Sequence, residues 1–177
     1  MSLRNRSTAL YRGLSDLKAD LEIVASRHAR AGRPLAVLGD MSAVALVLLR
    51  ASIALRGAVG SALGTRTALR WIFHIDVWTD RIGAGLALPH PFNIVIGSGV
   101  TLGQGVTLLH NTTLQHAKAT SIGDNVVLGV GAVVLADRTV GAGAFCGANS
   151  VVTRDVPAGA TVVGVPARVL RGHEERS

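Results

Sequence analysis

The chain has 177 residues, enough for one domain with a sizeable core, and its formal net charge is +7. Hydrophobic residues make up 49% of the sequence and aromatic residues only 3%, so the core must be built from aliphatic side chains. The sixteen arginines are spread out rather than clustered, which argues against a nucleic-acid surface. The single cysteine, Cys146, excludes an internal disulfide and favours a reducing compartment. No signal peptide opens the sequence, so we expect a cytoplasmic protein.

The sequence predicts a first helix from residue 15 to about residue 31. Apolar residues recur there at helical spacing: Leu17, Leu21, Val24 and Ala25. Ser15 is the predicted N-cap, and Gly32 and Pro34 mark the predicted end.

Two more helices are predicted over residues 42–56 and 65–73. Gly57, Gly60 and Gly64 separate them. Arg50 and Arg56 interrupt the most apolar stretch, which argues against a membrane span but leaves contact with a membrane surface open.

After residue 80 aliphatic side chains recur at every sixth position, which neither a helix nor an alternating strand produces. Twelve positions follow this period in three runs. Ile82 and Leu88 begin it, a second run is Ile96, Leu102, Leu108 and Leu114, and a third is Ile122, Leu128, Val134, Val140, Cys146 and Val152. A hexapeptide period predicts a parallel β-helix, in which three six-residue units close one triangular coil. These twelve residues should point into the prism, and Cys146 is therefore predicted to be a core residue.

The hexapeptide frame breaks twice. Two extra residues separate Leu88 from Ile96, and two more separate Leu114 from Ile122. We expect loops at both breaks, where functional side chains are usually found. Three of the six histidines lie in or beside the breaks: His90, His110 and His116.

Three segments carry a family resemblance: Leu88-Pro89-His90, Asn93-Ile94-Val95-Ile96-Gly97 and Gly164-Val165-Pro166-Ala167-Arg168. They resemble the serine acetyltransferase branch of the hexapeptide acyltransferases, which includes O-acetyltransferases of polysaccharide synthesis. The resemblance implies a left-handed parallel β-helix that forms a homotrimer, or a dimer of trimers, with active sites between neighbouring prisms. It divides the chain into an N-terminal helical segment (1–74), an acyltransferase domain (75–171) and a C-terminal tail (172–177).

The resemblance implies that His90 is the catalytic base. Its imidazole would take the proton of an acceptor hydroxyl, which attacks the thioester of acetyl-CoA directly, in a ternary complex. A carboxylate should orient the imidazole and stabilise its charged form. Asp76 is the candidate and Asp80 the alternative, while a purely surface role for Asp76 stays open.

The binding residues implied by the resemblance fall into two groups. The candidates for the acceptor are Asn93, His110 and His116, with Lys118 as the alternative to His116 in replacing an Arg-His pair of the family. The candidates beside the pantetheine arm of CoA are the corner residues Val130, Gly131 and Ala148. The candidates for its phosphates are the cations Arg154, Arg168 and Arg171.

The sequence departs from the serine acetyltransferases where they hold serine. Pro89 replaces the Asp that precedes the catalytic histidine, and the loop after residue 114 lacks their Arg-His pair. Asp20 is either another anchor for an amine or a solvated carboxylate on a helix face. The acceptor therefore stays open between a serine-like amino acid and a sugar.

Other readings of the sequence remain. A non-catalytic β-helix, or one in which His90, His110 and His116 converge on a metal ion, is the main alternative, although no metal is expected. Trp71 and Trp78 are predicted to pack between the helices and the prism.

Overall fold

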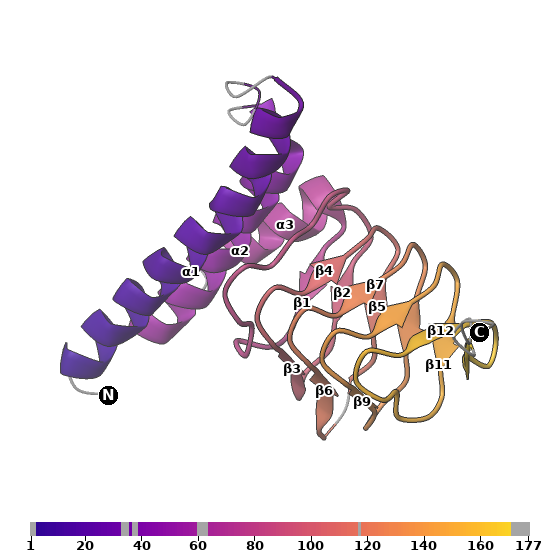
Figure 1. Cartoon of the computed structure of the whole chain (residues 1–177). Helices are drawn as coiled ribbons and strands as arrows, with labels where there is room; N and C mark the ends of the chain where they lie inside the picture. The colour runs from indigo at the N-terminus through magenta and orange to yellow at the C-terminus, as the bar shows by residue number, and fades with distance from the viewer. Residues whose placement is uncertain (1–2, 33–35, 37–38, 60–63, 117, 171–177) are drawn as a thin grey trace.

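The computed structural model describes residues 3–32, 36, 39–59, 64–116 and 118–170. Three helices precede the strands: α1 (Leu3–Arg30), α2 (Met41–Val59) and α3 (Thr65–Phe73). Helices α1 and α2 lie side by side at one end of a prism of strands, α3 contacts both α2 and β1, and the described chain ends at the opposite end of the prism (Figure 1). The predicted tail, residues 172–177, lies outside the described residues.

Helix α1 is longer than predicted. It begins at Leu3, so the prediction that Ser15 is its N-cap is wrong, and Ser15 lies exposed within the helix. Gly13 lies inside α1 facing α2, where an added Cβ would be 3.3 Å from the Cβ of Ala54. The predicted end is confirmed at Gly32, which has a φ of 70° and donates its amide to the Ala29 carbonyl, whereas Pro34 is outside the described residues.

Helix α2 begins directly after Asp40. The Asp40 carboxylate accepts a hydrogen bond from the Ser42 amide at 2.6 Å, so Asp40 is the N-cap. The helix continues to Val59, past Gly57, while Gly60 is outside the described residues. Helix α3 has the predicted bounds and follows Gly64. None of the helices in the described residues has the length and the apolar character that a membrane crossing needs.

The strands stack into three sheets, in the orders β1-β2-β5-β8-β11, β3-β6-β9 and β4-β7-β10-β12-β13. All pairs are parallel except β12 with β13, which confirms the predicted parallel β-helix. The strands are β1 (Asp76–Val77), β2 (Val95–Ile96), β3 (Val100–Leu102), β4 (Thr107–Leu108), β5 (Thr113–Leu114), β6 (Thr120–Ile122), β7 (Val127–Leu128), β8 (Val133–Val134), β9 (Thr139–Val140), β10 (Phe145–Cys146), β11 (Val151–Val152), β12 (Thr161–Val163) and β13 (Arg168–Val169).

All twelve predicted hexapeptide positions are buried, and the most exposed of them, Ile82, is 6% exposed. Cys146 is completely buried, as predicted. A second inward column, which the sequence analysis did not identify, lies two residues before the first. Its aliphatic members are Leu86, Ile94, Val100, Val106, Val126, Ala132 and Ala144.

The two breaks in the frame leave the register of the coils intact. Val133 and Val151 are partners one coil apart and are separated by 18 residues, whereas Thr113 and Val133 are partners separated by 20 residues. The first break lengthens its coil in the same way, because Ile82 pairs with Leu102 across 20 residues. The additional residues therefore protrude from the prism, and the strands above and below them stay aligned.

Candidate active site

His90 lies exposed in the first protruding loop, between the β-bridge at Ala87 and strand β2. Two helices hold this loop. The Ser42 hydroxyl at the start of α2 donates to the carbonyl of Pro89 at 3.3 Å. The ring of Phe73, the last residue of α3, lies 5.8 Å from the ring of Phe92. The helical segment therefore contributes to the placement of His90.

The His90 ring meets the His110 ring from the next coil. Their centroids are 5.7 Å apart and the rings are nearly perpendicular, at 83°. His110 is half-buried, and its Nδ1 is buried without a hydrogen-bond partner among the described residues. A buried ring nitrogen without a partner is costly to the fold.

One edge of the prism brings His90 together with most of the predicted binding residues. Along this edge the amide of each coil donates to a carbonyl of the preceding coil: Asn111 to Phe92 at 3.0 Å, Gly131 to His110 at 3.0 Å and Asn149 to Val130 at 2.7 Å. The predicted site residues stacked there are Asn93, His110, Val130, Gly131 and Ala148. We call these residues with His90 the His90 edge.

His116 lies at the other end of the same sheet, after strand β5 rather than before it. Its Nδ1 is 3.1 Å from both the amide nitrogen and the hydroxyl of Ser98, and its ring centroid is 6.0 Å from that of Trp78. Arg154 follows strand β11 on this second edge and is exposed. One chain therefore does not bring His116 to His90.

Two other predicted cations lie apart from His90. Arg168 is exposed in β13, at the far end of the prism, and its Nη1 donates to the Ala167 carbonyl at 3.1 Å. Lys118 is exposed, and its amide donates to the Asp137 carboxylate. Arg171 is outside the described residues.

Asp76 is half-buried in β1, paired with Val95 one coil later. Among the described residues no hydrogen bond or ion pair joins it to His90, so its predicted role in orienting the imidazole stays a prediction. The alternative, Asp80, is already ion-paired with Arg56 at 2.9 Å.

Asp76 borders a hollow of about 640 Å³ between α3 and β1. The lining residues are Arg66, Thr67, Arg70, Trp71, His74, Asp76 and Trp78. Trp71 is 79% exposed, so the prediction that it packs between the helices and the prism is wrong, and Trp78 is 46% exposed. Apart from Asp76, the sequence analysis missed this group, although arginines and a tryptophan on one predicted helix were a signal.

Arg66 is the most constrained side chain of the hollow. Its guanidinium carbon lies 4.6 Å from the centre of the Trp78 ring, and its Nη2 donates to the Val77 carbonyl. Burial lowers the pKa of Arg66, and repulsion from Arg56 and Arg70 adds to this effect. The hollow therefore carries an excess of positive charge.

The chain is similar to curated acetyltransferases, although no family model matches it. It is 43% identical over 106 residues to a serine acetyltransferase of Buchnera aphidicola subsp. Acyrthosiphon pisum, covering 55% of this chain and 39% of that protein. It is 36% identical over 122 residues to serine acetyltransferase 2 of Arabidopsis thaliana, covering 65% and 38%. The chain thus spans about two fifths of the length of these curated relatives.

Solved structures extend the match to the helices. The serine acetyltransferase of Neisseria gonorrhoeae aligns with a TM-score of 0.79 and 29% identity, over 93% of this chain and 68% of that one. The chain is serine acetyltransferase-like in sequence and fold. The match also confirms the predicted left-handed β-helix. A Brucella abortus serine acetyltransferase in complex with coenzyme A aligns with a TM-score of 0.78 and 28% identity, over 93% of this chain and 71% of that one.

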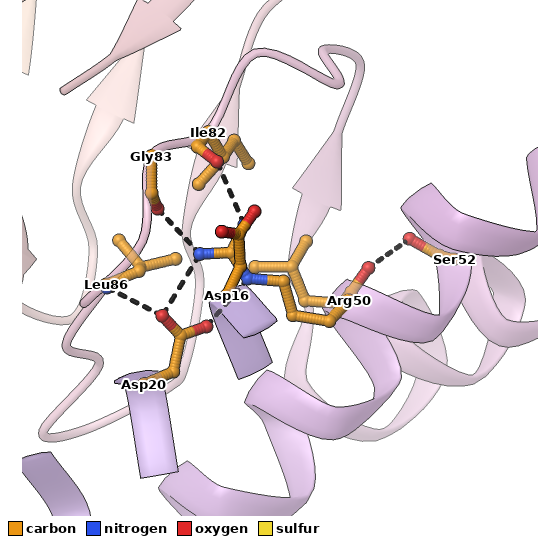
Figure 2. Close-up of polar contacts among 8 residues, drawn as sticks. Asp16, Asp20, Arg50, Ser52, Ile82, Gly83 and Leu86 are labelled. Carbon is orange, nitrogen blue, oxygen red and sulfur yellow. Dashed lines mark hydrogen bonds and ion pairs between the residues drawn. The ribbon is translucent and has the colours of Figure 1, made fainter. Parts of the chain in front are cut away.

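In this serine acetyltransferase-like chain Asp20 is not a solvated carboxylate, and that prediction is wrong. Asp20 is completely buried and accepts hydrogen bonds from Arg50 Nε at 2.7 Å, Arg50 Nη2 at 3.0 Å and the Leu86 amide at 2.9 Å (Figure 2). Burial raises the pKa of the Asp20 carboxyl, and the bonds from Arg50 oppose that shift. The Asp20 carboxylate is thus already hydrogen-bonded within the protein.

The histidines do not form a metal site within one chain. Among the described residues no group of three His, Cys, Asp or Glu side chains could hold a metal ion. His90 and His110 share one edge of the prism, and His116 lies on another.

Proposed function

We propose that this chain is an O-acetyltransferase that moves the acetyl group of acetyl-CoA to the hydroxyl of a small acceptor. The observation that carries the proposal is the His90 edge, where an exposed imidazole, the half-buried His110 and the corner residues lie on one line in a serine acetyltransferase-like fold. We assign the activity to the β-helix, residues 75–171, with residues 1–74 as a helical segment. The single buried thiol fits a reducing compartment, so we also propose a cytoplasmic location.

His90 acts as the general base. One ring nitrogen takes the proton of the acceptor hydroxyl as its oxygen bonds to the thioester carbon. The tetrahedral intermediate then collapses, the carbon–sulfur bond breaks, and the imidazolium returns the proton to the departing thiolate. No acyl-enzyme forms, because the one cysteine is buried in the core and cannot reach a thioester.

Asp76 is the proposed carboxylate partner of His90, and His110 and Asn93 are proposed to contact the acceptor. Asp76 is preferred over Asp80 because Asp80 is ion-paired with Arg56. Asn93 is already oriented on this edge, since its Nδ2 donates to Asn111 at 3.1 Å.

Acetyl-CoA is the proposed donor, in keeping with the Brucella relative solved with coenzyme A. Its pantetheine arm would lie along the corners at Val130, Gly131 and Ala148. The exposed guanidinium groups of Arg154 and Arg168 would then meet the CoA phosphates. We expect no metal in this reaction.

We further propose a homotrimer, in which the second edge of one prism faces the His90 edge of the next. That arrangement would bring His116 of one chain to His90 of another. Mixing the His90→Ala and His116→Ala variants under conditions that exchange subunits should then restore activity that neither variant has alone. Mixtures that stay as inactive as the separate variants would contradict a shared site.

The central test is replacement of His90 by Ala, followed by thiol release from acetyl-CoA with L-serine, L-homoserine and a panel of sugars. Turnover should fall by about 10²- to 10⁴-fold, the usual contribution of a general base. The thermal midpoint and the affinity for coenzyme A serve as controls and should not change, because His90 is exposed. A variant that retained the full rate would overturn the proposal.

A further inference from the structure

We propose that the hollow between α3 and β1 is the acceptor subsite and that it takes an acidic sugar, a pyranose ring that carries a carboxylate or phosphate. This inference rests on the proposed acetyl transfer and identifies the class of acceptor. Three observations support it: the position of the hollow beside the His90 loop, the charge of its arginines and the exposure of its tryptophans.

The hollow is next to the His90 loop. The carbonyl of Phe73 accepts the amide of Asn93 at 3.0 Å, and the following residue, His74, lines the hollow. Asp76, the proposed partner of His90, lines it too. An acceptor seated there would therefore contact Asp76 and lie next to the segment that is hydrogen-bonded to the His90 loop.

The charge of the lining favours an anion. Arg66 and Arg70 face a single lining carboxylate, that of Asp76. Burial lowers the pKa of Arg66, and repulsion from Arg56 and Arg70 adds to this effect. The Arg70 side chain is exposed and makes no hydrogen bond or ion pair with any described residue. A bound carboxylate or phosphate would relieve the repulsion and give Arg70 a bidentate partner.

The two indoles favour a ring rather than an amino acid. Trp71 and Trp78 both line the hollow and expose much of their surface to solvent, which is unusual for the largest aromatic side chain. The C–H face of a pyranose ring offers an apolar surface to pack on an indole, whereas serine has no comparable face. A volume of about 640 Å³ is also in the range that holds drug-sized ligands, and serine would leave most of it empty.

The chain supplies its own reporter for this site. Its only two tryptophans are Trp71 and Trp78, so the tryptophan fluorescence, excited selectively over that of the single tyrosine, comes entirely from the hollow. We would titrate the full-length protein with glucuronate, glucose 1-phosphate, glucose and L-serine. The two acidic sugars should change the fluorescence saturably, and glucose should bind at least about tenfold more weakly, since a charged hydrogen bond is lost. Equal affinity for glucose and glucuronate, or no response to any sugar, would overturn the subsite.

Two variants and a matched control localise the binding. Arg70→Gln should lower the affinity for both acidic sugars by roughly tenfold. Trp71→Phe should keep the Trp78 response with reduced affinity. Arg30→Gln removes the same charge at the exposed end of α1, where Ser26 is the one described residue to which the Arg30 side chain bonds, and should change nothing. An Arg70→Gln variant that bound acidic sugars as tightly as Arg30→Gln would contradict the proposal.

Thiol release separates the failure of this inference from failure of the proposed function. His90-dependent thiol release on L-serine, without any fluorescence response to acidic sugars, would overturn the subsite and leave the transferase proposal intact. A saturable response to acidic sugars, with no thiol release from acetyl-CoA on any acceptor, would support the subsite and overturn the transferase.

Discussion

Arg50 Nε donates to Asp20 Oδ2 at 2.7 Å, and neither side chain reaches solvent appreciably, at 3% and 0% exposure. The same guanidinium donates to the carbonyls of Ile82 and Gly83 at 2.9 and 2.6 Å. Asp20 in turn accepts the amide of Leu86. This buried network joins α1 and α2 to the first coil of the prism (Figure 2).

Replacement of Arg50 by Met should lower the free energy of unfolding by about 3–5 kcal/mol, because it leaves the Asp20 carboxylate buried without its partner. Urea denaturation at pH 7 measures the change. Lys18→Met is the control, since Lys18 is 80% exposed in an ion pair with Glu22 and should cost at most about 1 kcal/mol. Equal losses in the two variants would show that the buried network does not hold the helices.

The Asp40 cap should make the free energy of unfolding depend on pH in the acid range. Burial raises the pKa of the Asp40 carboxyl, but hydrogen bonds from His28 and Ser42 outweigh it, so the net shift is below the ordinary value of 3.8. A depressed pKa stabilises the fold above pH 3.8, and this contribution disappears as the pH falls through the lower, folded pKa. Asn caps helices as well as Asp does, so Asp40→Asn removes the charge alone.

We therefore expect the parent to exceed Asp40→Asn in unfolding free energy at pH 6. The difference should shrink as the pH falls below about 4. Urea titrations of both proteins from pH 6 to pH 3 give the comparison. A difference that stayed constant across this range would contradict the assignment.

The corner glycines should be intolerant of a methyl group where coils meet. A Cβ on Gly123 would lie 2.6 Å from the amide nitrogen of Ala142 in the next coil, and backbone cannot move aside as a side chain can. Gly123→Ala should therefore destabilise the fold by about 1–3 kcal/mol. Gly39→Ala is the matched control. Apart from its chain neighbours, no described residue has an atom within 4 Å of the added methyl, so the variant should stay within about 0.5 kcal/mol of the parent in thermal unfolding.

The Cys146 thiol should be unreactive in the native protein. It is completely buried, and desolvation raises its pKa to about 11, so very little thiolate exists at pH 8. A disulfide reagent should find almost no thiol in the folded chain and one thiol per chain in 6 M guanidinium. Rapid labelling of the native protein would contradict the inward position of Cys146. An unreactive Cys146 thiol would leave the thiol-release assay free of background from the enzyme.

The prism was predictable because its signal is local and repeated. Each hexapeptide position packs on its equivalent one coil away, so the period alone identified buried residues such as Leu108 and Leu128. The start of α1 was not predictable in this way. Ser15 looks like a cap but lies within the helix, and Gly13, usually a helix breaker, is placed there by its close contact with Ala54.

The candidate site was predictable only in part, for a related reason. Resemblance identified His90, His110 and Val130, and the structure stacks His110 and Val130 on the same edge. The hollow was missed because Arg70 and Trp71 belong to a helix whose contact with β1 depends on tertiary packing. The burial of Asp20 was missed because its partner Arg50 is thirty residues away and belongs to a different helix.

The protruding loops have a consequence for how such a chain can diverge. Closing a slightly longer loop costs little free energy, because the entropic penalty grows only with the logarithm of its length. Thr113 and Val133 stay paired although their coil carries two extra residues, so the insertion does not change the pairing of the strands. Loop length beside His90 and after β5 can therefore drift during evolution while the prism stays constant, and a lineage could acquire a new acceptor without first acquiring a new fold.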